Sequence, residues 1–217
     1  IEEGRIAYDN IRKVIHLLIS TGFAEIVLII LSMLFFIPIP LLPVQLLWLN
    51  LVTNGIQDVA LGLERGEPDV LKRKPRDPKE RIFNAIMIRR VIVGGLYMGI
   101  SAFAVFYAVL SLGYSESSAR NITLLLMVLF ENAHVFNSRS ETLSIFRIEH
   151  RNNYLLLFSV LFTQLIHISS LYIPFMQKLL DLEPVSFQEW SILSVIALGL
   201  VFVMEIEKKL SKTLPLR

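Results

Sequence analysis

The 217 residues of the chain are 54% hydrophobic, and the mean hydropathy is +0.60. Soluble domains use roughly 45–50% apolar residues even when glycine is counted, so the composition favours a membrane protein embedded in a lipid bilayer. The chain has no cysteine, which excludes disulfides, thiolate metal sites and redox motifs. The net charge of +2 is small because the charges are segregated along the chain, and we expect no nucleic-acid partner.

Six apolar segments follow one another along the chain. A transmembrane helix needs roughly 20 apolar residues, with a range near 17–25. Four segments reach this length, and polar-flanked ends or tilt extend the two shorter ones. The sequence therefore predicts an all-α membrane protein with six transmembrane helices in a bundle. The segments cover residues 14–37, 41–63, 91–112, 122–136, 154–173 and 191–204.

The positive charges indicate the orientation of these helices. Six crossings place both ends of the chain on one side of the membrane. Of the 21 Lys and Arg, only Arg120 and Lys178 fall outside the N-terminal segment, the loops 64–90 and 138–153, and the tail. Because cytoplasmic loops carry an excess of Lys and Arg, we predict that both termini are cytoplasmic. The lack of cysteine and the short outer loops favour a bacterial inner membrane.

A polar stripe marks the second apolar segment. Its members are Asn50, Thr53, Asn54, Gln57 and Asp58, which fall within an arc of roughly 140° on an α-helix. Polar groups at bilayer depth are expensive and usually face a bundle interior or an ion path. Carboxylate, amide and hydroxyl oxygens are the ligands that hard cations prefer. The stripe therefore predicts a helix that handles a cation.

Two further carboxylates lie in apolar segments. Glu25 is near the middle of the first segment, and Glu131 is toward the cytoplasmic end of the fourth. An ionised carboxylate in such a segment costs on the order of 3 kcal/mol, so both are candidate cation ligands. The other interpretation is a buried, neutral or paired carboxyl at Glu25 and a capping residue at Glu131. For the stripe, the other interpretation is hydrogen bonding between packed helices.

Three local patterns lead to further expectations. Gly55 follows Asn54, and glycine permits the helix to unwind and to free carbonyl oxygens for a cation. Gln164 is expected to bond to neighbouring helices. Glu205 and Glu207 alternate with apolar residues before Lys208 and resemble a solvated helix end.

The chain contains neither a P-loop nor a phosphorylation motif of the Asp-Lys-Thr-Gly type. We therefore expect that it does not hydrolyse ATP on its own. It begins at Ile1 with a charged, amphipathic segment that is unlike a signal peptide, and we expect it to be a piece of a longer polypeptide.

These features together resemble a known family. The segments EEGRIAYDNIRKVIHLLIS, PVQLLWLNLVTNGIQDVALGLE and ENAHVFNSRSE are similar to the fifth, sixth and eighth membrane helices of type II P-type cation-transporting ATPases, the group that contains the calcium pumps. The resemblance implies helices five to ten of such a pump. It implies a stalk over residues 1–13, two ion-site helices over 14–63, a cytoplasmic loop over 64–90, four supporting helices over 91–207 and a tail over 208–217.

The resemblance also implies roles for individual residues. Glu25, Asn50, Thr53 and Glu131 match ligand positions of the calcium pumps. Asn54 stands where those pumps have an aspartate that bridges two ions, and Gly22 stands where they have an asparagine. Asp58 is an extra carboxylate about one turn further on. The implied metal ligands are thus Glu25, Asn50, Thr53, Asn54, Asp58 and Glu131, for one calcium ion, a monovalent ion or another divalent ion.

The function implied is the ion-binding half of an ATP-driven cation pump, and the chain alone is not expected to be a complete enzyme. ATP and Mg²⁺ would act only in the full-length parent. The partners would be the preceding membrane helices and the phosphorylation domain, docking on residues 1–13 and 64–90. An alternative is an ion-coupled secondary transporter or channel that is complete with six helices, and another is a membrane scaffold without transport.

Overall fold

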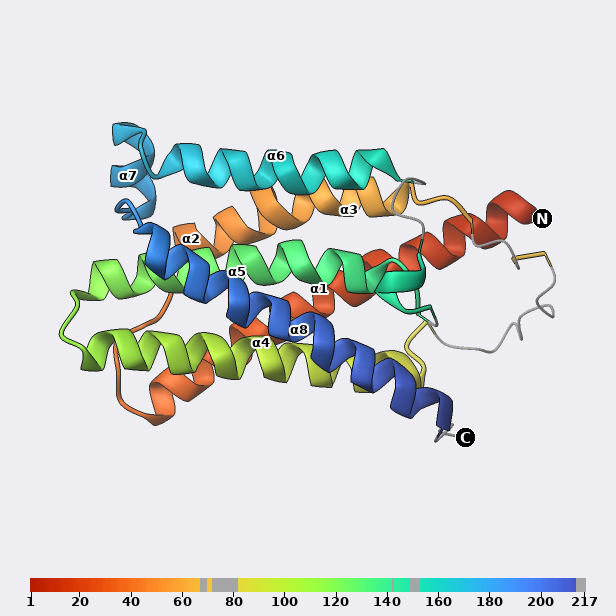
Figure 1. Cartoon of the computed structure of the whole chain (residues 1–217), viewed down its shortest axis with the longest axis horizontal. Coiled ribbons are helices and arrows are strands. Elements are labelled where there is room, and N and C mark those ends of the chain that lie inside the picture. The colour runs from red at the N-terminus through yellow and green to blue at the C-terminus, as the bar shows by residue number, and fades with distance from the viewer. Residues whose placement is uncertain (67–69, 72–81, 142, 149–152, 214–217) are drawn as a thin grey trace.

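The computed structural model describes residues 1–66, 70–71, 82–141, 143–148 and 153–213. Within these ranges every regular element is a helix, which confirms the predicted all-α class. The longer helices run side by side along one bundle, and the N-terminus and the last described turn of α8 lie at the same end (Figure 1). The elements are α1 (Glu2–Leu34), α2 (Pro43–Trp48), η1 (Leu49–Asn54), α3 (Gly55–Gly62), α4 (Ala85–Ser111), α5 (Glu116–Ser138), η2 (Ile145–Arg147), α6 (Tyr154–Ser170), α7 (Pro174–Leu180) and α8 (Phe187–Thr213).

Short polar side chains define where several helices begin. Asn84, Ser115 and Asn153 each precede a helix, and each accepts a hydrogen bond from a backbone N–H in its first turn. These bonds satisfy donors that have no partner inside the helix. Pro174 occupies the first position of α7, where a missing N–H costs nothing.

Three helices, α1, α4 and α8, are each long and apolar enough to cross a membrane. The pair α6 and α7 adds a fourth candidate if the two count as one span, although they are bent by 93°. These helices support the predicted membrane protein. The six-span topology remains a prediction, because the second predicted span is divided among α2, η1 and α3 and because α5 contains many polar residues. The orientation of the spans also remains a prediction.

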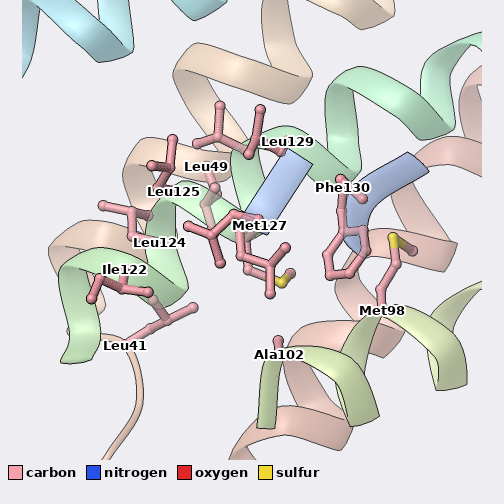
Figure 2. Close-up of a cluster of buried hydrophobic side chains, with 14 of the residues drawn as sticks. Leu41, Leu49, Met98, Ala102, Ile122, Leu124, Leu125, Met127, Leu129 and Phe130 are labelled. Carbon is pink, nitrogen blue, oxygen red and sulfur yellow. The ribbon is translucent and has the colours of Figure 1, made fainter. Parts of the chain in front are cut away.

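Helix α5 forms the centre of the bundle. It packs against α1, α4, α6, α8 and η1, and the stretch from Asn121 to Asn132 is buried throughout. Its apolar side chains meet Leu49 of η1 and Met98 and Ala102 of α4 in the main hydrophobic cluster (Figure 2). A helix that is surrounded by protein can carry polar residues on its inner faces, provided that they find partners.

Glycines bring α1 and α4 into close contact. A Cβ atom added at Gly99 would lie 2.7 Å from the carbonyl oxygen of Ala24, and one added at Gly95 would lie 3.1 Å from that of Ser20. Small residues at these positions therefore let the two backbones approach. The contact fixes the part of α1 that leads into Glu25.

The C-terminal half of α8 corrects one expectation. Glu205 and Glu207 are only 8% and 4% exposed, so the predicted solvated helix end is wrong. Glu207 accepts hydrogen bonds from Arg89 and Arg90 of α4 at 2.9 Å and 2.8 Å, and Glu205 accepts one from the backbone N–H of Ile145 at 2.9 Å. Packing against α4 and η2 therefore buries side chains whose sequence pattern indicates exposure.

Candidate cation site

The polar stripe lies on a continuous helical stretch with a π-helical middle. Residues Leu49–Asn54 form a π-helix between α2 and α3, and the backbone angles at Leu49 and Gly55 are those of a right-handed helix. The expected unwinding at Gly55 is therefore wrong. A π-turn is wider than an α-turn and often occurs at functional sites. Here it carries Asn50, Thr53 and Asn54.

Glu25 and Asn50 contact each other across the gap between α1 and η1. The Asn50 amide donates hydrogen bonds to the two carboxylate oxygens of Glu25 at 3.2 Å and 3.4 Å, and to the carbonyl oxygen of Leu46 at 2.9 Å. Glu25 is 9% exposed, whereas Asn50 is exposed. The structure therefore brings these two predicted ligands together at the surface of the described bundle.

A second group of predicted ligands lies deeper. Thr53, Asn54 and Glu131 are at most 1% exposed. Glu131 on α5 lies close enough to the side chains of Thr53 and Asn54 for weak polar contact, but neither of its carboxylate oxygens makes a hydrogen bond of good geometry, and neither does the Oδ1 atom of Asn54. Buried oxygens without partners are costly and require an explanation. A bound cation would satisfy all three.

Asp58 extends this group by one turn. It lies on α3, its Oδ1 atom is buried without a hydrogen-bond partner, and its charge acts on Glu131, as does that of Glu25. Three carboxylates from α1, α3 and α5 thus approach one region of the bundle. Among the residues that the structure describes, no three acidic or histidine side chains are close enough to enclose a metal ion. The candidate ligands meet at two places, between α1 and η1 and between α5 and η1, but they do not surround one point.

Gly22 adds no ligand and leaves space. A Cβ atom at this position would have no neighbouring atom within 4 Å. The asparagine that the resemblance places there has no counterpart on this part of α1. The remaining candidate ligands are the side chains predicted from the sequence at the other positions.

The polar residues Thr21 and Thr163 also belong to this region, and sequence reasoning missed them. The Asn54 amide donates to Thr21 Oγ1 at 3.2 Å. Gln57 donates to Asn132 Oδ1 at 2.6 Å, and Asn132 donates to Gln164 Oε1 at 2.7 Å, which confirms the expected bonding of Gln164 to a neighbouring helix. Thr163 joins the same network at 3.4 Å from Gln57 and Asn132. The sequence holds one indication for Thr21. It precedes Glu25 by about one helical turn and therefore lies on the same face of α1.

Comparison with known proteins finds cation-transporting ATPases, the family that the sequence resembles. A family described as "Cation transporting ATPase, C-terminus" matches residues 38–210. A calcium-transporting ATPase of Bacillus subtilis is 36% identical over 191 residues, which cover 88% of this chain and 21% of the relative. An endoplasmic reticulum-type calcium-transporting ATPase of Arabidopsis thaliana is 29% identical over 245 residues, which cover 100% of this chain and 24% of the relative.

A calcium-transporting ATPase of Bacillus cereus is 29% identical over 228 residues, which cover 96% of this chain and 26% of the relative. The chain thus spans about a fifth to a quarter of the length of the curated relatives that it matches.

Proposed function

The chain belongs to the cation-transporting ATPase family, of which it represents the C-terminal part, and on this premise we propose that it is the membrane-embedded, ion-binding part of an ATP-driven calcium pump. The observation that carries the proposal is the set of buried oxygens of Glu131 and Asn54 that make no hydrogen bond of good geometry. They lie where α5 meets the π-helix, close to the charges of Glu25 and Asp58.

The charge and type of the ligands favour a divalent cation. Glu25, Asp58 and Glu131 supply carboxylates, and Asn50, Thr53 and Asn54 supply neutral oxygens. Calcium takes six to eight oxygen ligands in flexible geometry, which suits side chains from several helices. Because Gly22 offers no ligand and Asn54 carries no charge, we propose one bound calcium ion.

The remaining parts of a pump would lie elsewhere in a longer polypeptide. ATP and Mg²⁺ would act in its phosphorylation domain, and further membrane helices would cover the exposed side of Asn50. The stalk at residues 1–13 and the loop at 64–90 would receive the phosphorylation domain. In support, Arg5 of the stalk donates to the carbonyl oxygen of Val70 in that loop at 2.8 Å, although residues 67–69 and 72–81 lie outside the described part. We propose six membrane spans with both termini in the cytoplasm, and a bacterial inner membrane as the location.

The proposal predicts ATP-driven calcium uptake that depends on the named carboxylates. Vesicles containing the full-length polypeptide would be given ATP with Ca²⁺, Mn²⁺, Mg²⁺, Na⁺ or K⁺, and both uptake and ATP hydrolysis would be measured. We expect Ca²⁺ to stimulate turnover, and Glu131→Gln, Glu25→Gln and Asp58→Asn to lose the stimulation.

Glu116→Gln is the matched control, because Glu116 is also on α5 but forms an exposed pair with Arg120. Its uptake should equal that of the unchanged protein. Calcium stimulation that survives Glu131→Gln and Glu25→Gln would refute the proposed site. Ion flux without nucleotide would instead support a secondary transporter or channel.

A further inference from the structure

The ends of α3 and α5, two helices of the proposed site, meet the start of α6 at Glu64, which lies just beyond the end of α3. Glu64 is 7% exposed. Its Oε1 atom accepts a hydrogen bond from Arg139 at 2.6 Å, and its Oε2 atom accepts from Arg139 at 3.1 Å and from Asn153 at 2.7 Å. Arg139 follows the last residue of α5, and Asn153 precedes α6. One carboxylate therefore joins the ends of three helices, and we call Glu64, Arg139 and Asn153 the Glu64 clamp.

Side chains from two other helices also hold the end of α3. Asn153 donates to the carbonyl oxygen of Ala60 at 3.1 Å. Asn10 of α1 donates to the carbonyl oxygens of Gly62 and Glu64 at 3.1 Å and 2.7 Å. The last carbonyls of a helix lack partners within it. Here they accept hydrogen bonds from Asn10 of α1 and from Asn153, which precedes α6. These bonds fix the position of the end of α3 along the bundle and the direction of its axis.

The clamp lies at the ends of the helices that carry the proposed cation site. At 1.5 Å per residue, the end of α3 at Gly62 is roughly 6 Å along the helix axis from Asp58, and the end of α5 at Ser138 is roughly 10 Å from Glu131. Two helices that are held together at one end have little freedom to rotate or slide against each other at the next contact. The clamp therefore determines how the ligands on α3 face Glu131.

We propose that Glu64 is a positioning residue for cation binding, which acts by holding α3 and α5 in the orientation that brings Asn54 and Asp58 to Glu131. This inference rests on the proposed function, because it concerns the affinity of the same site. Replacing Glu64 by glutamine removes the carboxylate that accepts two hydrogen bonds from the buried Arg139 guanidinium. Breaking a buried ion pair by neutralising one partner is strongly unfavourable, so the helix ends will separate or admit water.

Glu207 provides a matched control. It is also a buried carboxylate, 4% exposed, and it binds Arg89 and Arg90. It joins α4 to α8, which carry none of the proposed ligands. A general loss of stability should affect both variants, whereas a loss of positioning should affect only the Glu64 variant.

The experiment measures calcium uptake by the full-length polypeptide in vesicles as a function of Ca²⁺ concentration. For Glu64→Gln we expect the half-saturating Ca²⁺ concentration to rise roughly five- to tenfold, within the usual range of coupling between separate sites, at a nearly unchanged maximal rate. Glu207→Gln should stay within about twofold of the unchanged protein on the same scale. Glu64→Asp keeps the charge and should restore much of the affinity.

Asn153→Ser tests the same inference with a milder change. Serine keeps an oxygen that can accept from the backbone N–H of Leu156, but it removes the amide that donates to Glu64 and Ala60. We expect a smaller rise in half-saturating Ca²⁺, in the same direction, even if Glu64→Gln fails to fold.

The inference is overturned if the half-saturating Ca²⁺ concentration is unchanged in Asn153→Ser and Glu64→Gln, or if it rises equally in Glu207→Gln. Glu131→Gln separates this failure from a failure of the proposed function. If Glu131→Gln abolishes calcium uptake while the clamp variants behave normally, only the positioning role of Glu64 is lost. If Glu131→Gln transports calcium normally, the site itself is wrong.

Discussion

The close contact between α1 and α4 predicts opposite effects for the same substitution at two glycines. In Gly99→Ala, the new methyl group would lie 2.7 Å from the carbonyl oxygen of Ala24 and 2.7 Å from Cβ of Val27. Ordinary contacts of a Cβ atom are 3.4–4 Å, so the helices must separate. In Gly22→Ala the new methyl group meets no atom within 4 Å.

The magnitudes can be worked out from the two positions. Alanine in place of glycine within a helix gains about 1 kcal/mol from helix propensity, and both variants receive this gain. Overpacking costs typically 1–3 kcal/mol, and only Gly99→Ala incurs it. We therefore expect Gly99→Ala to be about 2 kcal/mol less stable than Gly22→Ala. For a chain of this size, this corresponds to a difference in Tm of about 4–8 °C.

Thermal unfolding in detergent, followed by helical circular dichroism, would measure this difference. Both variants retain the same composition apart from the position of one methyl group, so their denatured states are closely comparable. Equal Tm values, or a higher Tm for Gly99→Ala, would show that α1 and α4 do not approach at Gly99 as described.

Two further substitutions test the packing around α5. Gln57→Leu removes the amide that donates to Asn132 Oδ1 in a buried network and leaves that oxygen only the longer bond from Thr163. The loss of one buried hydrogen bond costs about 1 kcal/mol, and an unchanged Tm would mean that this bond contributes nothing. Phe130→Ala removes a fully buried ring that packs edge-on against Tyr97 and leaves a cavity in the core. We expect the free energy of unfolding to fall by about 3–5 kcal/mol. Phe158→Ala, at a ring that is 64% exposed, should lower the Tm much less, and equal losses would contradict the assigned core.

Hydrophobic patterning was enough to predict the helical class and most of the long helices. Each long apolar run overlaps a helical stretch, because burial and backbone hydrogen bonding act on the same parts of the chain, although α1 begins twelve residues before its run and α8 ends nine residues after its run. The pattern missed α7, which is short and follows the bend after α6. It also gave no sign of the π-turn at Leu49–Asn54, since the extra residue in a π-turn depends on what the helix packs against.

The candidate site was only partly predictable for a related reason. The residue types of Glu25 and Asn50 indicated a cation site, but their mutual contact depends on how α1 and η1 are rotated, which one sequence does not specify. Glu64 and Arg139 are charged residues in predicted cytoplasmic loops, where charge ordinarily indicates exposure and orientation. Only the packing of α3, α5 and α6 shows that they form a buried pair.

The central position of α5 constrains how the protein is made. This helix buries Glu131, Asn132 and His134, so lipid is a poor environment for it. Ribosomes deliver a chain from its N-terminus, and α8, which packs extensively along α5, is synthesised after α5, α6 and α7. Until α8 arrives, one side of α5 faces the translocation machinery, lipid or a chaperone. The polar residues of α5 therefore reach their full packing only after α8 is made, and a chain truncated between α7 and α8 should be directed to membrane quality control.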